Sequence, residues 1–313
     1  MSAAPDAAEP TTLSRGGTNA VGRILGLLGD EWTLLIIQQA LLGATRYGEF
    51  MERLPISNSV LTNRLRSLTE NGLLVRTTYR TRPVRAEYLL SQRGRAFWPV
   101  LLSIWEWERR WVPDHVHLLP GMHHTACDSD FAPMLTCRPC GEVATEKEMT
   151  ARWGPSGSWP RSVPEVATRR RSTAGRGQAG LFPETMSVFG NRWAAALLVC
   201  AFLGTSRFTD FQTQLGAPPS LLAERLQTFC ANGVLQTGPA GARYELTEKG
   251  RAFFPVIIAA LQCGQHWFHA PEGPAVTVTH LGCGEPFTGV LICDQCAQPL
   301  KGSAIRLVGS ATA

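Results

Sequence analysis

Two segments of the chain carry one histidine and three cysteines at the same spacing, His-x2-Cys-x9-Cys-x2-Cys. Imidazole and thiolate groups are ligands that zinc prefers, and four of them complete a tetrahedral site. Because four protein ligands leave no position for water, we expect two structural Zn2+ ions per chain rather than catalytic ones. The candidate ligands form one set in each segment: His124, Cys127, Cys137 and Cys140, and then His280, Cys283, Cys293 and Cys296.

Other roles for these cysteines stay open at this point. They could be buried free thiols, or a redox switch, because oxidation of zinc thiolates releases the metal and unfolds the site. Disulfides fit poorly, since the first eighteen residues do not form a secretory signal and cytoplasmic thiols stay reduced. Cys200, Cys230 and Cys263 lie at apolar helical positions and are expected in the core.

The two segments belong to a longer internal repeat. Gly29-Asp30-Glu31-Trp32 recurs as Gly190-Asn191-Arg192-Trp193, an offset of 161 residues. The tetrapeptide Gly-Arg-Ala-Phe at 94–97 recurs at 250–253, an offset of 156, so the second copy has lost five residues in between. The offset of 156 also relates the two His/Cys segments, which indicates that each was duplicated together with its fold unit.

Each copy has the element order of a winged helix-turn-helix. In the first copy, apolar residues at helical spacing predict helices over 21–28, 32–42, 47–54 and 57–70. Runs at 73–79 and 86–91 predict a β-hairpin with a basic tip, and a long helix from Ser91 to Trp111 closes the unit. The expected fold is mainly α with small β-hairpins (α+β), in two tandem winged helix-turn-helix domains, each followed by a small zinc-ribbon-like knuckle.

The helix over 57–70 and the hairpin suit DNA. Leu61, Leu65 and Leu68 share one face and should be buried, which turns a polar face outward that matches a major groove. The hairpin has cations but no acid between Asn71 and Glu87, which suits phosphates or a minor groove. Both could instead be ordinary solvated surfaces. The candidate DNA contacts are Ser59, Thr62, Asn63, Arg64 and Arg66 on the helix, and Arg76, Arg80, Arg82 and Arg85 on the hairpin.

The second copy departs from this pattern. The outward positions of its corresponding helix are Ser220, Ala223, Glu224 and Gln227, and its shorter hairpin carries one cation, Arg243. A phosphate would repel Glu224. We therefore expect this copy to bind DNA weakly or to serve as the pairing partner, with Arg225 as its best remaining contact.

These motifs resemble the HxlR family of bacterial regulators. The resemblance rests on Gly-x-x-Trp-Thr-Leu-Leu-Ile from Gly29, Leu-Thr-x-Arg-Leu-x-x-Leu-x-x-x-Gly-Leu from Leu61, and Tyr-x-Leu-Ser-x-x-Gly from Tyr88. It covers residues 20–112 strongly and 181–268 more weakly. It implies a winged helix-turn-helix that binds double-stranded operator DNA as a dimer through its terminal helices. Here the two copies could form an intramolecular pseudo-dimer, or the chain could form a homodimer.

The expected organisation is a disordered tail (1–18), winged-helix domain 1 (19–112), zinc knuckle 1 (113–143), a basic flexible linker (144–179), winged-helix domain 2 (180–269) and zinc knuckle 2 (270–305). Domain 1 has thirteen Lys/Arg against eight Asp/Glu, whereas domain 2 has six against five, so domain 1 should be the main DNA reader.

The chain lacks a membrane-spanning apolar stretch, a phosphate loop and a catalytic nucleophile motif. We expect a sequence-specific regulator, most simply a repressor, that is not an enzyme and is cytoplasmic and nucleoid-associated. A small-molecule effector could act on it. The alternatives are a zinc/thiol redox-responsive regulator, or a protein-interaction scaffold with degenerate DNA binding.

Overall fold

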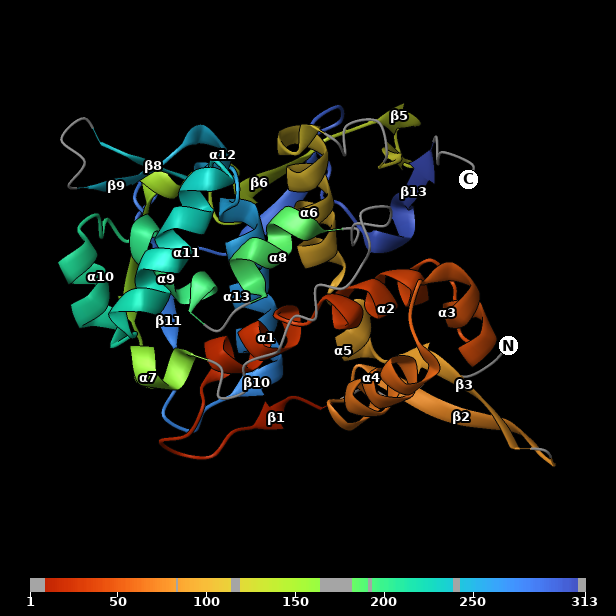
Figure 1. Cartoon of the computed structure of the whole chain (residues 1–313). Coiled ribbons are helices and arrows are strands. Elements are labelled where there is room, and N and C mark those ends of the chain that lie inside the picture. The colour runs from red at the N-terminus through yellow and green to blue at the C-terminus, as the bar shows by residue number, and fades with distance from the viewer. Residues whose placement is uncertain are drawn as a thin grey trace.

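The first copy folds as a winged helix-turn-helix. The computed structural model describes residues 9–82, 84–113, 119–163, 182–190, 193–238 and 243–308. In chain order this copy contains α1 (Ala20–Leu28), α2 (Glu31–Leu41), α3 (Tyr47–Arg53), α4 (Asn58–Glu70), β2 (Leu74–Thr81), β3 (Val84–Leu90), α5 (Gln92–Arg95) and α6 (Trp98–Trp111) (Figure 1).

Local sequence signals set the bounds of these helices. The side chains of Asn19, Asp30 and Ser57 accept hydrogen bonds from backbone N–H groups in the first turns of α1, α2 and α4. The closing helix differs from the expectation of one long element, because it is divided into α5 and α6. Pro99 lies in the first turn of α6, where a proline favours the start of a helix and lacks the N–H to continue one.

The second copy repeats this order with a shorter wing. Its wing strands have three residues each, against eight and seven in the first copy. Its elements are α8 (Pro183–Phe189), α9 (Ala194–Phe202), α10 (Phe208–Leu215), α11 (Pro219–Ala231), β8 (Leu235–Thr237), β9 (Tyr244–Leu246), α12 (Glu248–Arg251) and α13 (Phe254–Trp267). No helix of the described residues is long and apolar enough to cross a bilayer.

The two copies pack against each other through α1, α6 and α13. A side chain at Gly264 would lie 2.9 Å from Ile24 Cγ2, so glycine permits the close approach of α1 and α13. On the other side of the contact, Glu108 of α6 accepts hydrogen bonds from the backbone N–H and the hydroxyl of Thr185, at 2.8 and 2.6 Å. The chain therefore forms the dimer-like contact within itself.

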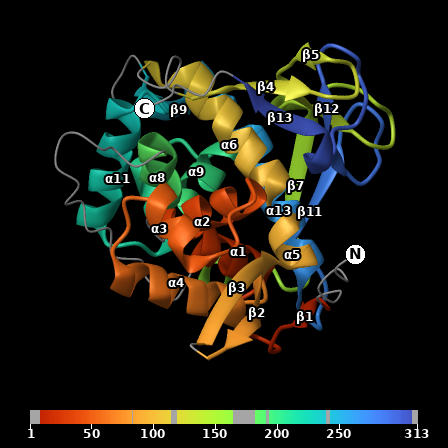
Figure 2. The ribbon, with the colours of Figure 1, turned by 90° about the vertical axis from the view of Figure 1, so that its right-hand side faces the viewer.

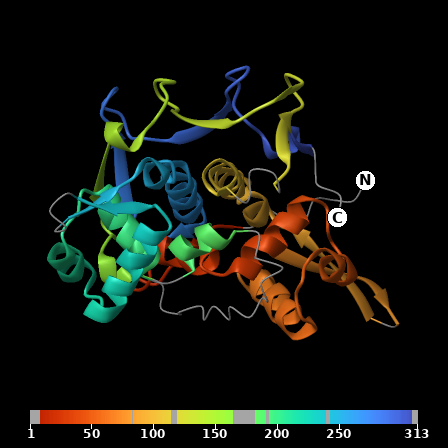
Figure 3. The same cartoon turned by 45° about the horizontal axis from the view of Figure 1, so that its top comes forward.

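The segments after the two copies form one layer of strands over α6 and α13 (Figures 2 and 3). Every main pairing in this layer joins one copy to the other. In the β6–β12 pair, Leu135 lies opposite Leu291, its own equivalent at the offset of 156 residues. The layer consists of β4 (Gly121–His124), β5 (Ser129–Asp130), β6 (Pro133–Cys137), β7 (Met149–Trp153), β11 (Val276–His280), β12 (Gly289–Cys293) and β13 (Ile305–Val308), with the pairs β4–β13, β6–β12 and β7–β11.

The region expected to be a flexible linker is largely structured where the structure describes it. Residues 146–148 form a 3₁₀ turn, β7 pairs antiparallel with β11, and α7 (Trp159–Ser162) packs beside α1. Asn19 Nδ2 donates hydrogen bonds to the Ser156 carbonyl and the Ser162 hydroxyl. The expectation was wrong for residues 146–162, because β7 pairs with β11 of the second copy and the α7 segment is bonded to the first copy, where Asn19 N donates to the Arg161 carbonyl. Residues 164–179 lie outside the described residues.

The expected disordered tail is also partly ordered. β1 (Thr11–Thr12) pairs in parallel with β10 (Phe268–His269), which follows α13. Arg93 Nη2 donates to the Glu9 carbonyl at 2.7 Å and to the Thr11 hydroxyl at 2.9 Å. The segment thus connects the first copy to the second, which corrects the expectation for residues 9–18; residues 1–8 lie outside the described residues.

Candidate nucleic-acid interface and metal centres

Helix α4 presents the polar face that its periodicity predicts. Leu61, Leu65 and Leu68 are buried, with at most 1% of each residue exposed. The opposite face is exposed and consists of Ser59, Thr62, Asn63 and Arg66. Arg66 Nη2 donates to Asn63 Oδ1 at 3.0 Å, so these two side chains form a single polar unit on the surface.

Arg64 has a different position from its neighbours. Its guanidinium lies 2.5 Å from a carboxylate oxygen of Asp30, the residue whose other oxygen caps α2 through Thr33 N. Arg64 therefore ties α4 to the start of α2 and is occupied within the protein. This differs from its expected role as a direct DNA contact.

Two further residues, one beside α4 and one beside the wing, were not singled out as site residues from the sequence. Tyr47 Oη of α3 lies 3.0 Å from the Asn58 carbonyl oxygen and 3.3 Å from Thr62 Oγ1. Arg46 is exposed, and its guanidinium lies 5.4 Å from the centre of the Tyr79 ring on the wing. The available signal for Arg46 was its place just before a helix, matched by Arg207 in the repeat.

The wing of the first copy carries an exposed group of cations. Arg76, Arg80, Arg82 and Arg85 are all exposed, and Arg80 lies opposite Arg85 in the strand register. The register shifts between Thr78 and Arg80, an irregularity that increases the local twist of the hairpin. Figure 1 shows β2 and β3 projecting from the body of the protein. Such a projecting cationic hairpin can follow a phosphate backbone.

The equivalent surface of the second copy is poorer in free positive charge. Ser220, Glu224 and Gln227 are exposed on α11, and Ala223 is half-buried. Arg225 was the expected contact here, but its guanidinium lies 2.5 Å from the Glu224 carboxylate. The adjacent acid therefore neutralises Arg225. The tip of this wing, residues 239–242, lies outside the described residues.

The eight His/Cys residues gather into two clusters that each take ligands from both copies. One cluster contains His124, Cys127, Cys293 and Cys296, and the other contains Cys137, Cys140, His280 and Cys283. The expected grouping within each segment was wrong. The observed grouping arises because β4 pairs with β13, β6 with β12 and β7 with β11. These pairings bring the His-x2-Cys half of each segment beside the Cys-x2-Cys half of the other segment.

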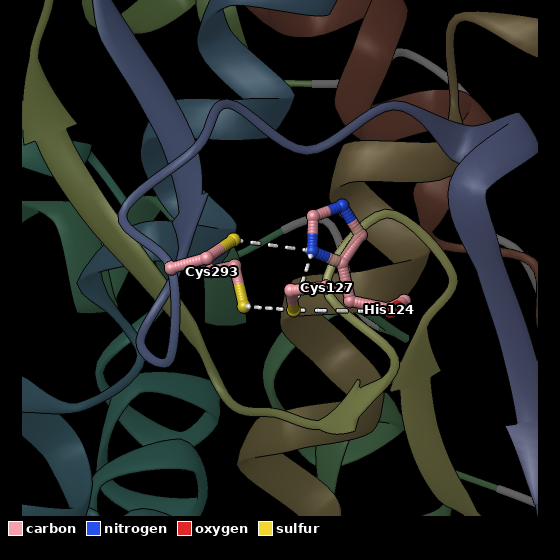
Figure 4. Close-up of side chains that lie close together, drawn as sticks. His124, Cys127 and Cys293 are labelled. Carbon is pink, nitrogen blue, oxygen red and sulfur yellow. Dashed lines mark hydrogen bonds between the residues drawn. The ribbon is translucent and has the colours of Figure 1, made fainter.

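The distances within each cluster suit a tetrahedral metal ion. His124 Nδ1 lies 3.3 Å from Cys127 Sγ and 3.5 Å from Cys296 Sγ, and Cys127 Sγ lies 3.9 Å from Cys293 Sγ (Figure 4). In the second cluster the corresponding distances are 3.3, 3.4 and 4.0 Å. Zinc bonds of about 2.3 Å to sulfur and 2.0 Å to nitrogen place tetrahedral ligands about 3.5 to 3.8 Å apart. The two donor sets therefore fit zinc.

Backbone conformation and hydrogen bonds make these thiols suitable as metal ligands. The residues after the second cysteine of each Cys-x2-Cys pair, Gly141 and Ala297, have φ of +79° and +55°, which closes a tight turn around the sulfur atoms. A backbone N–H of Glu285 lowers the pKa of Cys283 to about 7, and one of Gln298 lowers the pKa of Cys296. Each cluster thus has one thiol biased toward the thiolate that binds metal.

The remaining cysteines are packing residues. Burial raises the pKa of both Cys200 and Cys263 to about 12, which keeps them as neutral thiols. Both are buried, whereas Cys230 is half-buried against the core. The expectation that Cys200 and Cys263 are core residues is confirmed.

Comparison with known proteins identifies the duplicated unit. The family model described as HxlR-like helix-turn-helix matches residues 27–116 and again residues 188–272. An uncharacterized HTH-type transcriptional regulator of Mycobacterium tuberculosis is 35% identical over 136 residues, which cover 44% of this chain and 86% of the relative. The uncharacterized HTH-type transcriptional regulator YvaP of Bacillus subtilis is 35% identical over 91 residues, covering 29% of this chain and 84% of YvaP.

A solved structure from Pseudomonas aeruginosa, of a protein proposed to be a transcription factor, is 29% identical to this chain. The match covers 46% of this chain and 97% of that protein, with a TM-score of 0.36.

Proposed function

The chain belongs to the HxlR-like helix-turn-helix family of transcriptional regulators, and we propose that its first copy is the main reader of an operator while its second copy serves as the pairing partner. The observation that carries this proposal is the difference between the two DNA-facing surfaces. Arg66 and the wing arginines are exposed without an acidic partner among the described residues, whereas Arg225 is neutralised by Glu224. Since the chromosome is the ligand, the protein would act in the cytoplasm.

In this proposal the α4 face enters the major groove. Arg66 and Asn63 can pair with base edges there, and the hydroxyls of Ser59 and Thr62 can bond bases or phosphates. The wing arginines would contact the flanking backbone or minor groove. Arg64 and Tyr47 would hold α4 in place through Asp30 and Thr62.

The proposal is tested with the wing. An operator duplex is first selected by genome-wide footprinting, and binding of the full chain is then measured by fluorescence anisotropy at several salt concentrations. The triple variant Arg80→Ala/Arg82→Ala/Arg85→Ala should reduce the slope of log K against log salt by about 2 to 3, because each lost phosphate contact removes about one unit. Arg243→Ala, which removes the cation of the second wing, is the matched control and should change the slope little. An unaltered slope in the triple variant would contradict the assignment.

We also propose that the two clusters are structural zinc sites. The support is a complete set of three thiolates and one imidazole in each, with donor spacing that suits the ion. Bound zinc would supply crosslinks between the copies, and the chain's own residues would hold the winged helices at a fixed separation. Protein purified under reducing conditions without a chelator should contain two zinc ions per chain by elemental analysis. Metal-free, folded protein would refute this.

A further inference from the structure

An apolar cavity of about 130 Å³ lies where the two copies and the strand layer meet. Its walls come from α1 of the first copy, α9 and α13 of the second, and the β7–β11 strand pair. Only Glu146 and Ser162 among its lining residues are polar. Glu146 is paired with Arg251 at 3.2 Å, and the Ser162 hydroxyl accepts a hydrogen bond from Asn19. Among the described residues, the lining therefore offers no free charge to a ligand.

The internal repeat explains why space exists here. On α9, Ala195 and Ala196 line the cavity where the first copy has Leu34 and Leu35. On α13 three of the cavity-lining residues are again smaller than their equivalents on α6. Phe254 replaces Trp98, Ala260 replaces Ile104 and Leu261 replaces Trp105.

In the first copy the larger side chains are well packed. Leu34, Leu35 and Ile104 are buried, and the buried Trp105 donates its indole N–H to the Pro120 carbonyl at 3.0 Å. Two wall residues of the second copy, Phe189 and Phe202, are larger than their equivalents Leu28 and Leu41, but the five named above are smaller than theirs. The smaller side chains of the second copy thus leave a cavity where the first copy has a filled core.

We propose that this cavity binds a neutral, single-ring aromatic molecule. An apolar cavity of about 150 Å³ lined by Leu, Ile and Phe stays dry and accepts benzene, so the present volume suits one ring. In the cavity wall, the rings of Trp153 and Trp159 meet edge to face with their centres 4.9 Å apart. This arrangement favours a further aromatic partner. Leu203 and Trp153 are 48% and 40% exposed, so an apolar rim connects the cavity with solvent among the described residues.

The position gives the site a role beyond reading DNA. A bound ring would contact α1 of the first copy and both α9 and α13 of the second, so it would bear directly on how the two copies pack. Ligand binding at this site requires neither DNA nor an occupied operator surface, so it can be tested independently of the proposed DNA contacts.

The test is calorimetric titration of the zinc-loaded full chain with toluene. Benzoate, which has the same ring but carries a negative charge, is titrated for comparison. We expect saturable binding of toluene at one site per chain and at least tenfold weaker binding of benzoate, because the lining that the structure describes has no free cation. The variant Ala195→Leu/Leu261→Trp places in the cavity the side chains that the first copy has at the equivalent positions, Leu34 and Trp105. It should reduce toluene affinity at least tenfold.

Ala231→Leu adds the same atoms as Ala195→Leu on the exposed end of α11 and should bind toluene like the unaltered chain. If the double variant loses its circular dichroism spectrum, Ala260→Ile supplies a smaller filling that also restores the residue of the first copy. Absence of saturable toluene binding by the folded unaltered chain would overturn the proposal. Equal toluene affinity in a folded, filled variant would overturn it too.

Discussion

Two arginines on one helix show how position decides the role of a residue. Arg64 and Arg66 are two residues apart on α4, and both carry a full positive charge. Arg64 turns toward α2, where it pairs with Asp30, while Arg66 stays on the exposed face beside Asn63. Sequence reasoning placed both at the DNA surface, because helical geometry gives the direction of a side chain but not the acid that a distant helix brings to it.

This difference predicts separable effects of alanine substitution. Arg66→Ala should weaken operator binding by about 1 to 3 kcal/mol and leave the thermal midpoint unchanged, since only an exposed contact is lost. Arg64→Ala should lower the free energy of unfolding by about 1 kcal/mol, because the ion pair is partly exposed and solvent screening limits its contribution. Anisotropy and thermal unfolding measured on both variants distinguish these roles. A pure stability loss in Arg66→Ala would contradict the assignment.

The turns that follow the two Cys-x2-Cys pairs give a second comparison between equivalent residues. Gly141 and Ala297 both have positive φ, and a Cβ at Gly141 would meet no atom within 4 Å. A side chain at this position therefore carries only the backbone cost of the left-handed conformation, about 1 to 2 kcal/mol. The greater freedom of glycine in the unfolded chain offsets part of that cost.

Ala297→Gly should accordingly stabilise the protein by about 0.5 to 1 kcal/mol, and Gly141→Ala should destabilise it by a similar amount. Chemical unfolding of the zinc-loaded protein measures both changes. Shifts of the same sign in the two variants would show that something other than the backbone conformation governs these turns.

At the scale of elements, local signals were sufficient for the winged helices but not for the strand layer. Helices such as α2 and α4 follow from apolar spacing and from caps at Asp30 and Ser57, which lie within a few residues of the helix. The strands β1 and β7 have two and five residues, and their hydrogen-bond partners lie more than a hundred residues away. No local pattern marks such strands, so the sequence predicted a tail and a linker there.

The amino-terminal strand has a measurable contribution to stability. Deletion of residues 2–13 would remove the β1–β10 pairing and two acceptors of the guanidinium of the buried residue Arg93, the Glu9 carbonyl and the Thr11 hydroxyl. We expect a loss of about 2 kcal/mol in the free energy of unfolding, since each net hydrogen bond contributes about 1 kcal/mol. Chemical unfolding checks the loss, and zinc content should stay at two ions per chain. Unchanged stability would show that this segment is dispensable.

At the scale of the whole molecule, the sequence could not reveal that each His/Cys cluster combines residues of both copies. Spacing singled out the eight residues that the structure gathers into two clusters. It could not choose the grouping, because each segment repeats the same motif and either arrangement gives one histidine and three cysteines per site. Only the long-range pairing of β6 with β12, centred on Leu135 and Leu291, decides between them.

The two groupings make opposite predictions for double variants, and this gives the sharpest test of the architecture. Cys127 and Cys293 share a cluster, whereas Cys127 and Cys137 belong to different clusters. Cys127→Ser/Cys293→Ser should therefore retain one tightly held zinc ion per chain after competition with a chromogenic chelator, because the second cluster is intact. Cys127→Ser/Cys137→Ser should retain none, because it damages both clusters. Sites confined to single segments would reverse this order. Cys127 and Cys137 would then share one site, so their double variant would keep one ion, whereas Cys127→Ser/Cys293→Ser would damage both sites and keep none.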